Sequence, residues 1–88
     1  PYTLAGDESF YKLLSAAWPN YYRHERWEYP LARQYVHEGS TILEIGCGRG
    51  YFLRSIEKHC KRVVGLEFNK EAITQKVCQS PVLSISTE

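Results

Sequence analysis

Three glycines at every second position, together with two glutamates, are the residues of this sequence best suited to chemistry. Gly46, Gly48 and Gly50 follow a short apolar run at residues 41–45 and precede another apolar segment. Glycines let the backbone turn tightly and let a ligand approach it, and a helix that follows offers N–H groups and a partial positive charge. The stretch therefore predicts a loop that binds a negatively charged ligand group, such as a pyrophosphate or a carboxylate.

The acidic residue Glu67 has the spacing of the second half of a nucleotide site. It lies 21 residues after Gly46, close to the interval of about 20 at which an acid accepts hydrogen bonds from ribose hydroxyls. Its place near the end of the apolar run at residues 62–68 supports this role, although a solvated strand end is the alternative. Glu44, two residues before Gly46, is either a ligand-binding acid or a structural acid bonded to nearby backbone.

The elements that must position these residues alternate between strands and helices. Strands are predicted at residues 41–45, 62–68 and 82–86, and helices at residues 51–60 and from the cap Asn69 to Val77. Such alternation implies right-handed crossovers and a parallel sheet. The nearly continuous apolar run at residues 62–68 is typical of a strand covered on both faces.

Two helices are predicted before the first strand. The first begins after Asp7 and ends at Pro19, and the second lies within residues 23–39. In the second, Pro30 occupies the first turn or a kink, Gly39 forms the C-terminal cap, and one face carries Trp27, Leu31 and Tyr35. We expect residues 1–40 to form a helical segment that packs on the sheet or covers its ligand edge, and residues 41–88 to form the cofactor-binding domain.

An aromatic segment at residues 19–29 contains four aromatic side chains and two arginines. It has two interpretations: a cover over a ligand pocket, or an aromatic face packed on the sheet with Arg23 and Arg26 in solvent. Tyr22 and Trp27 are the residues that best distinguish them.

Composition excludes several classes. The formal charge of +1 and the scattered lysines and arginines give no nucleic-acid-binding patch, and no apolar run is long enough to cross a membrane. No secretory signal is visible, and the three widely spaced cysteines indicate reduced thiols in a cytoplasmic protein. Cys47 is interpreted as a small filler because no histidine is close to it in sequence, and no spacing of histidine and cysteine predicts a metal site.

The glycine spacing separates two kinds of nucleotide site. A dinucleotide fingerprint requires glycine at position 51, where this chain has Tyr51. The segment reads E-x-G-x-G-x-G instead, and LEIGCGRG and VVGLEFN resemble the first two motifs of the class I, Rossmann-like S-adenosylmethionine-dependent methyltransferases. The resemblance covers residues 41–73.

The resemblance implies a cofactor site with assigned roles. The backbone of the loop would face the methionine part, Glu44 would hold its amino group through water, Glu67 would bind the ribose and Phe68 would lie against the adenine. The implied cofactor-binding residues are Glu44, Gly46, Cys47, Gly48, Gly50, Glu67 and Phe68. Catalytic residues are not identified.

The resemblance also implies an α/β fold with a partial Rossmann-like β-α-β-α-β sheet in the order 3-2-1, after two N-terminal helices. Because complete members have more strands, we expect this chain to be the N-terminal part of a longer enzyme, inactive alone. Its open edge at the first strand would favour dimers. A small-molecule methyl acceptor is expected because no basic patch is present. The alternatives are an NAD(P)-binding oxidoreductase domain and a non-catalytic Rossmann-like interaction module.

Overall fold

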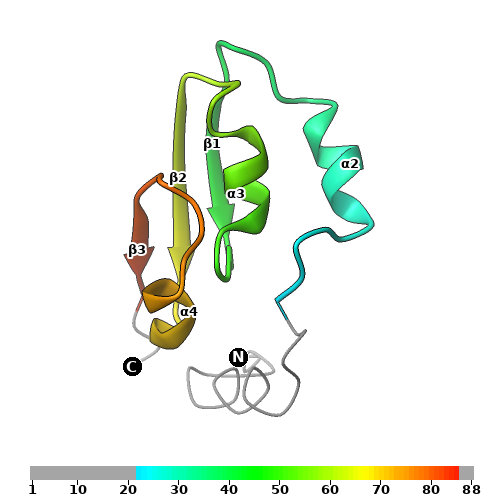
Figure 1. Ribbon diagram of the computed structural model, residues 1–88. Coiled ribbons are helices and arrows are strands. Elements are labelled where there is room, and N and C mark those ends of the chain that lie inside the picture. Colours follow the sequence, from blue (N-terminus) through cyan, green and yellow to red (C-terminus); the bar gives the residue numbers. More distant parts are fainter. Residues whose placement is uncertain (1–21, 86–88) are drawn as a thin grey trace, which may run out of the picture.

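The computed structural model describes residues 22–85, and the helix predicted after Asp7 lies outside them (Figure 1). The strands and helices alternate from residue 41 onward, which confirms the predicted α/β class. The elements are α2 (Glu28–Arg33), β1 (Thr41–Ile45), α3 (Tyr51–Ile56), β2 (Arg62–Glu67), α4 (Lys70–Thr74) and β3 (Val82–Ser84). None of the helices in this part of the chain has the length and apolarity needed to cross a membrane.

The three strands form one parallel sheet in the order β1-β2-β3. The predicted order 3-2-1 is the same arrangement read from the opposite edge of the sheet, with β2 in the middle. The register pairs Glu44 with Gly65 and Glu67 with Ser84. Parallel strands place their carboxyl ends at one edge of the sheet, so the loop after β1 and the end of β2 lie next to each other (Figure 1).

The helix α2 is shorter than predicted. Pro30 lies in its first turn, as expected, but the helix ends at Arg33 with Gln34 as its C-terminal cap. The predicted cap at Gly39 is therefore wrong. Between the helix and β1 the chain makes turns instead, in which the His37 N–H donates to Ser40 Oγ at 3.0 Å. Side-chain hydrogen bonds of this kind compete with helical ones.

The other two helices also end early, at Ile56 and Thr74. Asn69 caps α4 as predicted, because its side chain accepts a hydrogen bond from the Glu71 N–H. Val77, predicted to be helical, instead donates its N–H to the Arg49 carbonyl at 2.8 Å. That bond ties the segment before β3 to the glycine loop.

The core lies between α3 and the sheet. Phe52, Leu53 and Ile56 of α3 are buried together with Val63 of β2. Tyr29 of α2 packs on this cluster, with its ring centroid 5.1 Å from that of Phe52. Helix α2 is therefore attached to the core on the side of the sheet that α3 occupies.

Two predictions about packing are wrong. Trp27, Leu31 and Tyr35 were predicted to share a helical face, but Tyr35 lies beyond the helix and the three are 78%, 52% and 81% exposed. Tyr29 and Val36 make the core contacts of this segment instead. The second face of β2 is less covered than predicted: its Val64 and Leu66 are only half-buried. Within residues 22–85, the neighbouring apolar side chains on that face are exposed: Leu43, Ile45 and Leu83.

Candidate functional site

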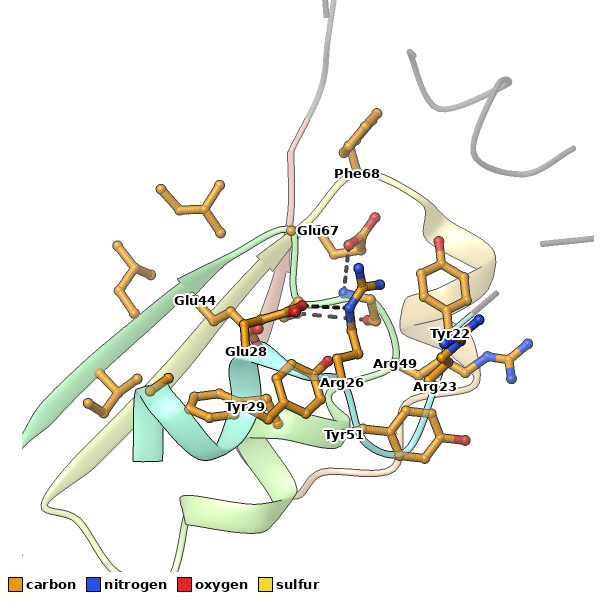
Figure 2. A pocket seen from close by; sticks show the side chains of 18 residues that line it. Tyr22, Arg23, Arg26, Glu28, Tyr29, Glu44, Arg49, Tyr51, Glu67 and Phe68 are labelled. Atoms are coloured by element: carbon orange, nitrogen blue, oxygen red, sulfur yellow. Dashed lines mark hydrogen bonds and ion pairs between the residues drawn. The ribbon is translucent and has the colours of Figure 1, made fainter. Parts of the chain in front are cut away.

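A pocket of about 540 Å³ opens at the carboxyl ends of β1 and β2 (Figure 2). Its volume is within the range of roughly 300–1,000 Å³ typical of small-molecule sites. Its walls come from the segment before α2, from α2, from β1 and the glycine loop, and from the end of β2. Six of the seven predicted site residues line it: Glu44, Gly46, Cys47, Gly48, Glu67 and Phe68. Gly50 does not, and serves as the N-terminal cap position of α3.

The glycine loop adopts a conformation that other residues rarely adopt. Gly46 and Gly48 have φ of 75° and 59°, in the left-handed region. A Cβ at Gly46 would meet no atom within 4 Å, whereas a Cβ at Gly48 would lie 2.6 Å from Cδ1 of Tyr22. Glycine at position 48 therefore permits the close approach of an aromatic ring to the loop.

The backbone amides of the loop are already engaged. The N–H groups of Gly46 and Cys47 both donate to the Leu66 carbonyl, at 2.8 and 3.1 Å. The Gly48 N–H donates to Glu67 Oε1 at 2.7 Å, and the Gly50 N–H to the Cys47 carbonyl at 2.9 Å. The N–H groups of Gly46, Cys47 and Gly48 therefore hold the loop against β2, whereas that of Gly50 closes a turn within the loop.

Glu67 is buried, with 3% of its surface exposed, so the alternative of a solvated strand end is wrong. Its two oxygens accept hydrogen bonds from the N–H groups of Gly48 and Asn69, at 2.7 and 2.9 Å. Because each carboxylate oxygen has two acceptor positions, both retain capacity for a ligand hydroxyl. Glu67 thus links the loop to the end of β2 and also faces the pocket.

Glu44 carries a buried oxygen without a partner. Its Oε1 atom has no hydrogen-bond partner among the described residues. Burial first, and then the nearby carboxylates of Glu67 and Glu28, raise its pKa to about 7. A cationic ligand group would relieve both effects, because it would donate to this oxygen and neutralise its charge.

Tyr22 and Asn69 form a contact that the sequence did not indicate. The Asn69 side chain is fully buried, and its Nδ2 donates to the Tyr22 hydroxyl at 2.8 Å while its Oδ1 accepts from the Glu71 N–H. The Tyr22 ring thereby lies over Gly48, with the Arg49 guanidinium 5.4 Å from its centroid. At Tyr22, this favours the interpretation in which the aromatic segment covers the pocket. Trp27, the other residue chosen to distinguish the two interpretations, does not line the pocket.

Arg26, Glu28 and Tyr29 also line the pocket, and sequence reasoning did not assign them to a site. Arg26 Nε donates to Glu28 Oε1 at 2.6 Å. Burial and the Glu44 carboxylate raise the pKa of Tyr29 to about 12. The crowding of arginines and aromatic residues in the segment at 19–29 was the available signal, but only the fold shows which of them face β1.

Cys47 is a filler in the core, as predicted. It is 5% exposed, and a Cβ at Gly65 of β2 would lie 2.6 Å from its Sγ. Burial first, and then the carboxylates of Glu44 and Glu67, raise the pKa of its thiol to about 12. A thiol with this pKa is not a nucleophile at neutral pH.

The parallel sheet, the glycine loop after β1 and the acid at the end of β2 are the features of a Rossmann-like fold. The family model described as "Methyltransferase domain" matches residues 43–86. This span is half of the chain, and the chain belongs to that family; the class I resemblance is confirmed. No curated protein and no solved structure matches the chain. Membership implies a methyl donor and an acceptor.

Proposed function

We propose that the pocket binds S-adenosylmethionine and that the protein is a methyltransferase using it as the methyl donor for a small-molecule acceptor. The observation that carries this proposal is the unpartnered, buried Oε1 of Glu44 in the same pocket as the Glu67 carboxylate. The cofactor has a cationic amino group at one end and two ribose hydroxyls near the other. The Oε1 atom of Glu44 lacks a donor among residues 22–85, and the Glu67 carboxylate has acceptor capacity left, so the amino group fits the first and the ribose hydroxyls fit the second.

The predicted site residues take separate roles in this proposal. Glu44 holds the amino group, Glu67 accepts from the ribose hydroxyls, and Phe68 lies against the adenine. Gly46 forms a wall without a side chain, since a Cβ there would extend into open space. Cys47 and Gly48 shape that wall rather than donate to the ligand, and Gly50 turns the loop into α3.

The bound cofactor supplies an electrophilic methyl group on sulfur, which an acceptor atom attacks in line. The residues of this chain position the cofactor and exclude water, with Tyr22 over the glycine loop and Tyr29 beside Glu44. The acidic side chains assigned here contact the donor only. We therefore expect no methyl transfer by the 88-residue chain alone, and propose residues 41–88 as its donor-binding domain and residues 1–40 as a helical segment that covers the pocket.

Two further features are proposals of the same kind. The three cysteines are free, which suits a reducing, cytoplasmic location. Strand β1 pairs only with β2 in the described sheet, so its other edge is available to a strand of a second copy.

Calorimetric titration with S-adenosylhomocysteine and, separately, with NAD tests the proposal. We expect binding of S-adenosylhomocysteine only, weakened at least tenfold in Glu67→Gln and unchanged in Glu71→Gln. Glu71 is a matched control because its side chain is exposed and it does not line the pocket. Circular dichroism shows whether each variant is folded. Preference for NAD, or equal effects of the two variants, would contradict the proposal.

A further inference from the structure

Four amides of the glycine loop already donate hydrogen bonds within the chain, so they are poorly placed to bind a ligand carboxylate. Those of Gly46 and Cys47 share one carbonyl of β2, and those of Gly48 and Gly50 donate to Glu67 and to Cys47. An amino-acid ligand nevertheless brings a carboxylate together with its amino group. A buried carboxylate must be paired, and a cationic side chain of the pocket is suited to be that partner.

Three arginines line the pocket, and their positions differ: Arg23, Arg26 and Arg49. Arg49 is placed over the Tyr22 ring, 5.4 Å from its centroid. Figure 2 shows Arg23 and Arg49 beside Tyr22, whereas the Arg26 side chain extends toward Glu44 and Glu67. Arg26 is therefore the arginine on the side of the pocket where Glu44 would hold an amino group.

Glu28 fixes the position of Arg26. The Nε atom of Arg26 donates to Glu28 Oε1 at 2.6 Å, which leaves the terminal nitrogens of the guanidinium to point into the pocket (Figure 2). Glu28 is also close enough to Glu44 for its charge to raise the pKa of Glu44. The positive group of Arg26 and the unpartnered oxygen of Glu44 thus lie in one neighbourhood.

We propose that Arg26 binds the carboxylate of the amino-acid end of the cofactor, with Glu28 as the positioning residue for Arg26. This inference rests on the proposed function and adds the residue that distinguishes an amino-acid nucleoside from a nucleoside without a carboxylate. Arg26 supplies two N–H groups in the fork geometry that matches a carboxylate, which lysine cannot reproduce. Glu44 and Arg26 together match both charges of a zwitterion.

Three ligands separate this inference from the proposed function: S-adenosylhomocysteine, its decarboxylated analogue, and 5′-methylthioadenosine, which lacks the whole amino-acid end. We expect the 88-residue chain to bind S-adenosylhomocysteine most tightly. In Arg26→Gln, the affinity for S-adenosylhomocysteine should fall about tenfold or more, toward that of the decarboxylated analogue, while the affinities for the other two ligands stay within twofold. Arg26→Lys should retain an intermediate preference.

Two further variants complete the design. Arg54→Gln removes the same charge from an exposed position outside the pocket lining and should leave all three affinities unchanged. Glu28→Gln should reduce the preference for the carboxylate-bearing ligand less than Arg26→Gln does, because the guanidinium remains but loses its partner. A general structural defect would lower the affinities for all three ligands by the same factor. The ratio of the affinity for S-adenosylhomocysteine to those for the other two ligands would then stay unchanged.

The outcomes are distinct. If Arg26→Gln weakens all three ligands by the same factor, or if the wild type does not prefer the carboxylate, Arg26 does not bind it and the inference is overturned. If Arg49→Gln removes the preference and Arg26→Gln does not, the inference is also overturned. If the wild-type chain binds none of the three ligands, the proposed function fails first, and the inference fails with it.

Discussion

The contact between Gly48 and Tyr22 gives a prediction whose magnitude can be worked out from the structure. Replacing Gly48 by alanine would place a Cβ 2.6 and 2.9 Å from two ring carbons of Tyr22, where ordinary contact begins at 3.4 Å. The ring must move, and the hydrogen bond from Asn69 to its hydroxyl would then be lost. The same replacement at Gly46 meets nothing within 4 Å.

The two substitutions share one cost and differ in another. Both place alanine at a left-handed φ, which costs about 1–2 kcal/mol and is offset by about 0.4–1 kcal/mol from the lower entropy of the unfolded chain. Gly46→Ala should therefore destabilise the fold by about 1 kcal/mol. Gly48→Ala adds a further ~2 kcal/mol, because the buried Asn69 amide is left without its partner.

Urea denaturation followed by circular dichroism measures both values. A double-mutant cycle isolates the contact: in a Tyr22→Ala background, Gly48→Ala should cost no more than Gly46→Ala does in the wild type. Equal destabilisation by the two alanine substitutions in the wild-type background would refute the idea that Tyr22 lies over the loop in solution. The idea would also be refuted if Gly48→Ala still destabilised the fold more than Gly46→Ala in the Tyr22→Ala background.

Three other predictions concern titration, reactivity and association. Burial first, and then the carboxylates of Glu67 and Glu28, raise the pKa of Glu44 from 4.5 to about 7 on folding, so the folded state binds a proton more tightly than the unfolded state. The free energy of unfolding should thus fall by an amount on the order of 2 kcal/mol as the pH rises from 4.5 to 7, and Glu44→Gln should remove that component in urea titrations across this range. An unchanged pH profile in the variant would contradict it. The Cys47 thiol should resist iodoacetamide at pH 8 in the folded chain and react in urea, as mass spectrometry would show; rapid native labelling would exclude the buried position. Light scattering should detect dimers at high concentration that Ile45→Lys on β1 reduces, whereas a wild-type chain that stays monomeric would count against an associating edge.

The parts of the fold that local patterning controls were predictable from the sequence. The run at residues 41–45 became β1 with the predicted bounds, and Asn69 caps α4 through its own side chain. The glycines at positions 46, 48 and 50 each have positive φ, a conformation that the tight turn predicted from their spacing requires. These features depend on residues near one another in sequence, so no tertiary information was needed.

Features set by tertiary contacts were not predictable. A helical wheel places Trp27, Leu31 and Tyr35 together, but the chain leaves the helix at Arg33 and buries Tyr29 against Phe52 instead. Periodicity indicates which residues share a face and not which face meets the core.

Within the site, the sequence indicated Glu44 and Glu67 but not their hydrogen bonds. That Glu67 accepts from the loop amide of Gly48, and that Glu44 keeps an unpartnered oxygen, follows from how β1 and β2 are juxtaposed. Tyr22 and Arg26 come from the aromatic segment at residues 19–29, whose composition suggested a cover but not which of its side chains reach the loop. The family motifs therefore located the glycine loop and the two acids of the pocket, and the fold added the residues that cover them.

The most direct test of the central claim is a nuclear magnetic resonance titration of the 15N-labelled chain with S-adenosylhomocysteine, with NAD as the comparison ligand. If the pocket is the cofactor site, the amide signals of Gly46, Gly48 and Phe68 should shift with S-adenosylhomocysteine and far less with NAD. Signals from the exposed side of α2, such as that of Leu31, should remain in place. Shifts confined to that exposed side, or none in a folded chain at millimolar ligand, would contradict the account.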